Sequence, residues 1–213
     1  MDYRNGQQSC NSRSCHSRGQ YLLLMLQIVL RGISGVGKTT LRKMLATAFI
    51  SRQIPTTIQS KDEIREEIAR TTGIPYQFSE QNERIASYVY SSRVHALLHP
   101  SNKTSFSKCV LICDNTHVNP KQLRESEFLT EEYNPNVKRV LIEVGNPYSR
   151  STKESINPDV VKRQRGEMEK SSVELHNWCR VHYIPEYNIC EHSALEGGIR
   201  EIVEQLLEYK NNV

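Results

Sequence analysis

A glycine-rich segment, Gly32–Thr39, lies between a short apolar run and an amphipathic one. It reads Gly-Ile-Ser-Gly-Val-Gly-Lys-Thr and fits the pattern G-x-x-x-x-G-K-[ST] in full. Glycines let the backbone turn so that several N–H groups point at phosphate oxygens, and the positive end of the following helix adds to the attraction. The segment therefore predicts a loop that binds the phosphates of a nucleoside triphosphate.

Two side chains of this loop have further chemical tasks. Lys38 can reach the β- and γ-phosphates, and the hydroxyl of Thr39 can ligate Mg²⁺, so ATP and Mg²⁺ are the expected cofactors. The alternative is a chance glycine-rich turn, which the strand before the loop and the helix after it disfavour. The expected nucleotide-binding residues are Gly32, Ser34, Gly35, Val36, Gly37, Lys38, Thr39 and Thr40.

Short apolar or β-branched runs alternate with segments of helical periodicity along the chain. We expect strands at Leu26–Leu30, Thr56–Gln59, Cys109–Cys113, Lys138–Val144 and Tyr187–Cys190. We expect helices at Thr39–Ile50 and Glu80–Leu98, after capping boxes at Ser60–Glu63 and Ser193–Glu196, and after Asn119-Pro120 and Asn157-Pro158. This alternation predicts an α/β fold in three layers, with a parallel five-stranded sheet and a short lid in the polar connection Gly145–Asn157.

The length of 213 residues suits one globular domain, which we expect over residues 25–213. Residues 1–24 are rich in Ser, Asn, Gln and Arg, and we expect them to be disordered. The formal net charge is +4, and residues 1–24, with one Asp and three Arg, account for half of it. Bulk charge therefore permits a nucleic-acid partner without arguing for one.

The six cysteines show no Cys-x-x-Cys pair, which disfavours a zinc site and makes a reduced, intracellular protein, cytoplasmic or nuclear, the simpler interpretation. Cys109 and Cys113 lie in an apolar run and have the pattern of buried strand residues. The apolar run Tyr21–Leu30 is about half as long as a bilayer requires. A signal peptide cleaved there would remove the strand before the phosphate loop. We therefore expect neither a membrane span nor secretion.

A phosphate loop alone does not specify a reaction, because switch-type NTPases, motor proteins and small kinases share it. The size of the chain and the short basic connection after the fourth strand are typical of a kinase with a lid. From about Met25 to the helix after Pro158, the chain resembles the phage-type polynucleotide 5′-hydroxyl kinase family of P-loop kinases. The resemblance rests on the loop and on three short motifs, Lys61–Arg65, Cys113–Thr116 and Ser149–Lys153.

The first motif places an Asp and an Arg three residues apart. The resemblance implies that Asp62 is the general base on the acceptor hydroxyl and that Arg65 binds a phosphate of the substrate. From the residues alone, the two share one face of a helix N-terminus beside the strand ends where ligands bind, and an ionised Asp there can accept a proton. The alternative is that Asp62 complements the helix dipole and Arg65 is a solvated surface charge.

The second and third motifs carry weaker signals. The resemblance implies that Asp114 supports Arg65 or acts near Mg²⁺, although the family more often has Asp-Thr-Asn than the Asp-Asn-Thr found here. A turn-forming Asp is the alternative. By the same resemblance Arg150 is a lid arginine that closes over the ATP phosphates, with Lys153 as a second candidate. The alternative for both is an ordinary solvated loop charge.

Together these residues predict an ATP-dependent kinase, a phosphotransferase with an alcohol group as acceptor. The expected acceptor and partner is a nucleic acid with a 5′-hydroxyl end, DNA or RNA. The nearest alternative is a kinase of a small molecule such as a sugar, nucleotide sugar, antibiotic or metabolite; a non-catalytic ATP-binding regulatory protein is a further one. The expected catalytic residues are Lys38, Asp62 and Arg150, the expected substrate-binding residues are Arg65 and Asp114, and the expected metal ligands are Thr39 and Asp114.

Overall fold

The computed structural model describes residues 25–99, 109–124, 137–145, 157–182, 186–189 and 192–211. The N-terminal extension expected to be disordered lies outside these ranges. Most of the expected lid, including Arg150 and Lys153, also lies outside these ranges. The disorder of the extension and the role of the lid stay predictions.

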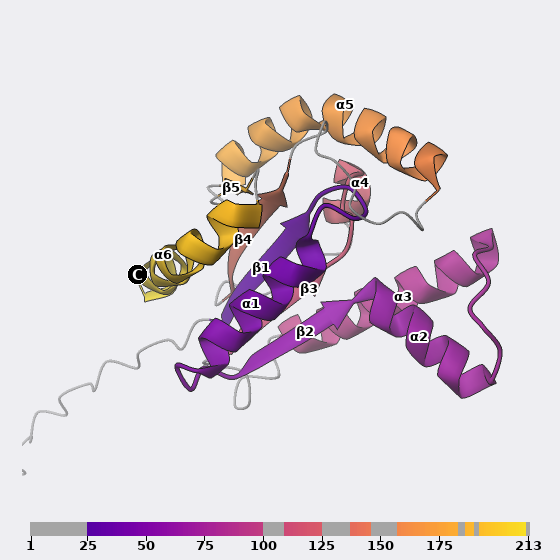
Figure 1. Ribbon diagram of the computed structural model, residues 1–213, viewed down its shortest axis with the longest axis horizontal. Helices are drawn as coiled ribbons and strands as arrows, with labels where there is room; N and C mark the ends of the chain where they lie inside the picture. Colours follow the sequence, from indigo (N-terminus) through magenta and orange to yellow (C-terminus); the bar gives the residue numbers. More distant parts are fainter. Residues whose placement is uncertain are drawn as a thin grey trace, which may run out of the picture.

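The described elements alternate between strands and helices in the predicted order (Figure 1). The strands are β1 (Met25–Arg31), β2 (Thr56–Ser60), β3 (Val110–Asp114), β4 (Val137–Val144) and β5 (Glu186–Ile189). The helices are α1 (Lys38–Ile50), α2 (Lys61–Thr72), α3 (Glu80–Leu98), α4 (Pro120–Leu123), α5 (Pro158–His182) and α6 (His192–Asn211). Most predicted element boundaries therefore fall within one or two residues of the observed ones.

The five strands form one parallel sheet in the order β2-β3-β1-β4-β5. This confirms the predicted α/β fold with a parallel sheet, although for β5 the structure describes the backbone alone. The register aligns Asp114 with Leu30 of β1 and with Ser60 of β2. The ends of β1, β2 and β3 therefore meet at one edge of the sheet, which is where ligands bind in open α/β folds.

Helices cover both faces of the sheet, which gives the three predicted layers (Figure 1). Side chains alternate along β1, so that Leu26, Ile28 and Leu30 pack against α1 and α6. Met25 and Val29 face the other way and pack against α3 and α5. The central strands β1 and β3 are buried and mainly apolar on both sides because each face is covered by helices.

The predicted helix starts are confirmed at three positions, but the side-chain contacts differ. Asn119 Oδ1 accepts hydrogen bonds from the first turn of α4, and Asn157 Oδ1 accepts one from the first turn of α5. Ser60 is the N-cap residue of α2, yet its side chain makes no capping hydrogen bond. The capping box predicted there is therefore not formed, because Glu63 turns away and pairs with Arg42 of α1 at 3.1 Å. At the last helix, α6 already begins at His192, so Ser193 lies inside the helix.

A wholly buried arginine at the end of β1 joins the sheet to α5. Arg31 donates from Nη1 to Glu143 Oε2 at 2.6 Å, from Nη2 to Ser171 Oγ at 2.6 Å and from Nε to the His117 carbonyl at 3.2 Å. A buried charge of this kind is stable only when it is paired and hydrogen-bonded. The network therefore ties α5 to the strand that supports the phosphate loop. Among the described helices, we find none whose length and hydropathy would let it span a bilayer.

Candidate nucleotide and acceptor site

The glycine-rich segment forms the turn between β1 and α1 at the centre of the sheet (Figure 1). Gly32 has a φ of 154°, and a Cβ built on it would lie 2.5 Å from the carbonyl oxygen of Val144. Gly37 is the N-cap of α1 with a left-handed φ of 108°, and the first turn of α1 contains no acidic residue. Both glycines are therefore required by the backbone, and the positive end of α1 points into the loop without an acidic side chain of its own to neutralise it.

Lys38 lies over this loop rather than in solvent. Its side chain is buried, and Nζ donates to the carbonyl oxygens of Gly32 at 2.9 Å and Ile33 at 2.6 Å. An ammonium group held by the carbonyls of its own loop is placed to meet the phosphates that the same loop binds. Thr39 and Thr40 are exposed at the start of α1.

The loop also touches α5, a contact that sequence reasoning missed. The backbone N–H of Ser34 donates to Gln164 Oε1 at 2.8 Å, and Gln164 is buried. Because the glutamine is 130 positions away in the chain, no local pattern connects it with the loop. The contact gives α5 a direct link to the expected phosphate-binding backbone.

Asp114 lies against the first turns of α1. Its Oδ2 is 3.4 Å from Thr39 Oγ1 and 3.3 Å from Nη1 of Arg42, whose other terminal nitrogen lies 3.1 Å from Glu63 Oε1. A hydroxyl and a carboxylate oxygen side by side are the hard ligands that Mg²⁺ prefers, so Thr39 and Asp114 fit a magnesium ion. Arg42 already neutralises part of this carboxylate's charge, and its buried Nε finds no hydrogen-bond partner among the described residues.

The expected pair between Arg65 and Asp114 is not formed. Arg65 instead donates from Nε to Glu83 Oε1 at 2.9 Å and from Nη2 to Glu83 Oε2 at 2.7 Å, and Nη1 pairs with Asp62. The reason is geometric: α3 runs beside α2 and brings Glu83 against Arg65, while Asp114 is engaged with α1. The structure does join Asp62 and Arg65 at the start of α2, as the spacing of three residues predicts.

Glu83 receives further donors and is a strong acid in this setting. Lys61 Nζ lies 3.0 Å from Oε2, and the Tyr76 hydroxyl donates to Oε1 at 2.9 Å. Burial alone would raise the pKa of Glu83, but hydrogen bonds from Arg65 and Lys61 outweigh it and lower the pKa to about 2. For Arg65, burial alone would lower the pKa, but the carboxylates of Glu83 and Asp62 outweigh it and raise the pKa. Both groups of the pair are therefore charged at neutral pH.

Beside this pair the surface is aromatic and open. The Arg65 guanidinium carbon lies 5.4 Å from the ring centroid of Phe78, whose side chain makes an edge-on contact with the ring of Tyr76. Phe78 is 78% exposed, and Asp62 is also open to solvent. The start of α2 thus presents the Asp62 carboxylate and the Arg65 guanidinium beside the exposed Phe78 ring.

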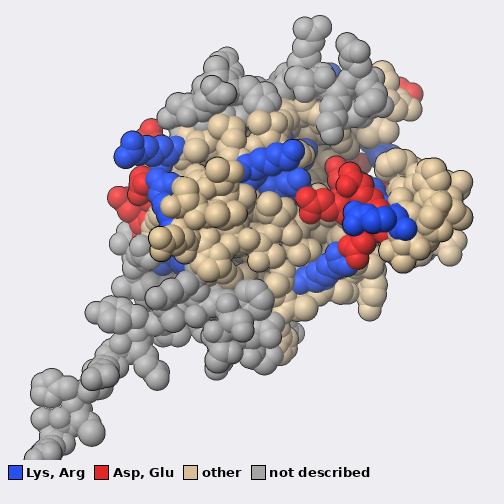
Figure 2. All heavy atoms as spheres, turned by 60° about the horizontal axis from the view of Figure 1, so that its bottom comes forward, with Lys and Arg blue, Asp and Glu red and all other residues tan. Residues whose placement is uncertain are grey.

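The charges around α2 and α3 are balanced rather than uniformly basic. On the right of Figure 2, where these helices lie, basic and acidic side chains alternate. The segment Lys61–Leu98 contains five Lys or Arg and six Asp or Glu, a formal charge of −1. Several of its arginines are paired within the segment, as Arg93 is with Glu67 and Arg84 with Glu80. This surface offers local cationic contacts instead of a basic track.

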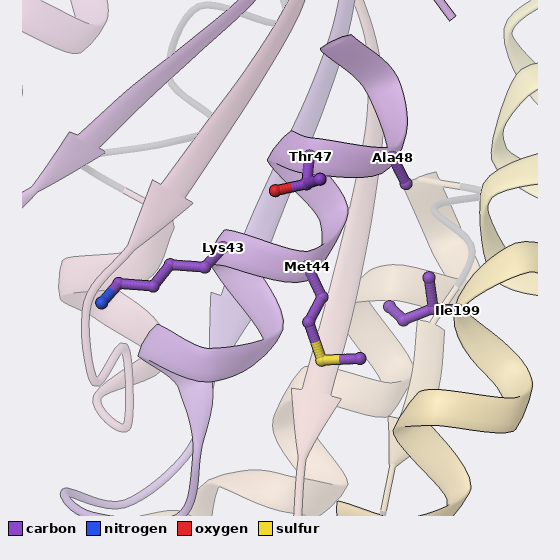
Figure 3. A pocket seen from close by; sticks show the side chains of 5 residues that line it. All are labelled: Lys43, Met44, Thr47, Ala48 and Ile199. Carbon is purple, nitrogen blue, oxygen red and sulfur yellow. The ribbon is translucent and has the colours of Figure 1, made fainter. Parts of the chain in front are cut away.

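A separate groove lies between α1 and α6, away from the phosphate loop (Figure 3). It is lined by Lys43, Met44, Thr47, Ala48 and Ile199. The surface of the groove is mainly apolar. In the figure the Lys43 side chain extends away from Ile199. It contains no residue of the sequence-predicted site.

The sequence matches no protein-family model, and a comparison with curated proteins finds no relative. Solved structures do resemble it. The Mycobacterium tuberculosis APS kinase CysC, as a cysteine-to-alanine variant, matches with 12% identity and a TM-score of 0.52, over 87% of this chain and 98% of that one. The same kinase in complex with AMPPNP and APS matches with 10% identity and a TM-score of 0.52, over the same shares of 87% and 98%. The crystal structure of APE1195 matches with 14% identity and a TM-score of 0.53, over 90% and 99%.

The chain has a P-loop kinase fold. Identities of 10–14% show the fold and not the substrate. The similarity spans nearly the whole of each neighbour and most of this chain. The phage-type polynucleotide kinase family is not among these neighbours, and the resemblance to it rests on the motifs alone.

Proposed function

We propose that this protein transfers the γ-phosphoryl group of ATP to a hydroxyl group of a small molecule that also carries an anionic group. The observation that supports this most is the arrangement at one edge of the sheet. A phosphate loop follows β1, Asp114 ends the neighbouring strand β3, and Asp62 beside Arg65 follows β2, the next strand along the sheet. Phosphoryl transfer needs little more than positioning and charge stabilisation, and this edge provides groups for both.

In this proposal each side chain has one task. The loop's backbone N–H groups and Lys38 hold the β- and γ-phosphates, and Thr39 and Asp114 would hold Mg²⁺, which supplies further neutralisation of phosphate charge. Asp62 orients the acceptor hydroxyl and takes its proton as the new O–P bond forms, while the bond from the γ-phosphorus to the β–γ bridging oxygen breaks and leaves ADP. Arg65 binds the anionic group of the acceptor. Arg150 remains our candidate for a lid residue that contacts the phosphates.

Two observations favour a small acceptor over a polynucleotide. The hairpin of α2 and α3 has a formal charge of −1, whereas proteins that hold a nucleic-acid backbone neutralise several phosphates with lysine and arginine. The APS kinase structures that share this fold are, in addition, those of small-molecule kinases. Both support the alternative that the sequence left open rather than the acceptor it favoured.

A polynucleotide 5′-hydroxyl remains the second candidate because of one specific feature. Asp62 and Arg65 have the spacing of the polynucleotide kinase motif, and they lie together at the start of α2. The partner of Arg65 is Glu83 rather than the expected Asp114, which departs from that family's pattern.

The test is transfer of labelled γ-phosphate from Mg-ATP to two groups of acceptors, phosphorylated or sulfated small molecules and 5′-hydroxyl oligonucleotides. Asp62→Asn should lose about 10²- to 10⁴-fold in turnover, the usual contribution of a general base, and keep nucleotide affinity. Glu66→Gln, an exposed carboxylate on the same helix, is the matched control and should be unchanged. Transfer to oligonucleotides alone would favour the second candidate. Equal loss of turnover and nucleotide binding in Asp62→Asn would contradict its role as base.

A further inference from the structure

The carboxylate of Glu83 is the centre of a cluster that no sequence motif marks. Four donors from three residues converge on it: Arg65 Nε and Nη2, Lys61 Nζ and the Tyr76 hydroxyl. Glu83 lies on α3, whereas Arg65 and Lys61 lie on α2. Resting on the proposed function, we propose that Glu83 is the positioning residue that holds Arg65 ready for the anionic group of the acceptor.

The hydrogen-bond geometry of Arg65 supports this role. A guanidinium group has five N–H donors in a planar arrangement. Glu83 takes the one on Nε and one on Nη2, and Asp62 takes one on Nη1. The hydrogen bonds to the two carboxylates leave two N–H groups, one on each terminal nitrogen, and the only other polar group described beside them is the neutral Tyr76 hydroxyl. Two charge-assisted hydrogen bonds are what a phosphate or sulfate group accepts from an arginine.

The number of remaining N–H donors on Arg65 distinguishes a positioning role for Glu83 from an inhibitory one. If Glu83 occupied all the donors of Arg65, an acceptor could bind only by displacing Glu83, which would then inhibit acceptor binding. Because two donors remain and the guanidinium plane is fixed by a two-point contact, the acceptor can bind without breaking the pair. A fixed guanidinium also loses less side-chain entropy when it binds an anion.

The chain offers a matched control on the same two helices. Glu67 of α2 and Arg93 of α3 form another two-point pair, with both distances 2.8 Å. Like the Arg65–Glu83 pair it joins α2 to α3, but it contains neither of the residues expected to meet the acceptor. If Glu83 only fastened the two helices together, removing either pair would have similar consequences.

The first experiment measures steady-state kinetics with the best small acceptor from the panel. Glu83→Gln should raise the KM for the acceptor by about tenfold or more, since it removes a charge-assisted pair, with the KM for ATP within about twofold. Glu67→Gln should leave both constants within about twofold. In a double-mutant cycle, Glu83→Gln should add little to Arg65→Lys, because Glu83 acts through the guanidinium. Equal effects of Glu83→Gln and Glu67→Gln, a lower acceptor KM in Glu83→Gln, or full additivity would overturn the proposal.

A second experiment does not depend on turnover, so it separates this inference from the proposed function. The side-chain Nε–H signal of Arg65, assigned by its loss in Arg65→Lys, is followed by NMR during titration with inorganic phosphate, with Mg-ADP present to fill the phosphate loop. The parent and Glu67→Gln should show a saturable shift that is weakened about tenfold in Glu83→Gln. Equal or tighter phosphate binding in Glu83→Gln would overturn the positioning role. Absence of transfer to every acceptor would count against the proposed function, while this titration would still decide the role of Glu83.

Discussion

The two helices that flank the candidate site are fixed in the molecule by different forces. Helix α1, behind the phosphate loop, buries six side chains, four of them apolar, against the sheet and α6. Helix α2, which presents Asp62 and Arg65, buries Ile64 alone. Ile68 packs, partly buried, against the same apolar cluster as Ile64. The other attachments described for α2 are mainly ion pairs, from Glu63 to α1 and from Lys61, Arg65 and Glu67 to α3.

Because of this difference, the attachment of α1 is strong and that of α2 is adjustable. Apolar burial stabilises by an amount proportional to area and depends little on salt, whereas partly exposed ion pairs contribute modestly and are screened. The nucleotide side is therefore built into the core, and the acceptor side is held in orientation by directional contacts. Substitutions on the two sides should therefore differ in how much stability they remove and in how strongly that loss depends on salt.

The largest effect is expected from breaking the attachment of α1. Phe49 is fully buried in the cluster shared with the sheet and α6, so Phe49→Ala should reduce the free energy of unfolding by about 3–5 kcal/mol. Urea unfolding measures it. Ile50→Ala is the control, because Ile50 is 59% exposed and should change the free energy by less than about 0.5 kcal/mol. Similar losses in the two variants would mean that α1 is not held by its buried face.

The next effect comes from the loop's close approach to β4. Gly32→Ala would place a Cβ 2.5 Å from the carbonyl oxygen of Val144 at a φ that side chains rarely adopt. It should destabilise the protein by about 1–3 kcal/mol, typical of overpacking, and weaken nucleotide binding. Gly166→Ala in α5, where nothing lies within 4 Å of the added carbon, should instead stabilise by about 0.5–1 kcal/mol. Thermal unfolding and ADP titration of both variants would show whether the signs differ.

A smaller effect should follow on the acceptor side. Glu67→Gln removes a two-point pair between α2 and α3, but both side chains are more than a third exposed. We expect a small loss of stability at low salt, which shrinks further in about 1 M salt. Urea unfolding at the two salt concentrations measures it. A loss as large as that of Phe49→Ala, unaffected by salt, would show that α2 is attached as firmly as α1.

The last prediction concerns pH. Because the pKa of Glu83 is lowered from 4.5 to about 2 in the folded protein, its ion pairs stabilise the fold fully above pH 4.5. That contribution is lost as the pH falls toward 2. The difference in unfolding free energy between the parent and Glu83→Gln should therefore be constant from about pH 5 to 8 and decrease below that range. A difference that already disappears between about pH 6 and 5 would contradict the depressed pKa.

The sequence predicted what depends on local patterns. Apolar runs, helical periodicity and helix-start signals located the described strands and helices, and the glycine-rich segment located the loop, because all of these are set by neighbours within a few residues. The pairing of Asp62 with Arg65 could also be predicted, since residues three apart share a helix face.

Contacts between different helices and strands could not be predicted from local patterns in the same way. The partner of Arg65 is decided by which helix lies beside α2, and nothing in the spacing of Glu83, 18 residues away, distinguishes it from the exposed Glu80. The capping box at Ser60 failed for a similar reason, because Arg42 of another helix offers Glu63 a charged partner. Arg42 and Gln164 were missed because each acts through a residue far away in sequence.

The position of β2 in the sheet has a consequence for motion. As the outermost strand in the order β2-β3-β1-β4-β5, it has one ladder of hydrogen bonds, to β3, whereas β1 has two. Local opening of β2 and α2 breaks fewer contacts than opening of β1, so amide hydrogens of β2 should exchange with solvent sooner. Under the proposed function, the half of the site that would admit the acceptor and release the product in every cycle is the half that can open while the nucleotide stays bound.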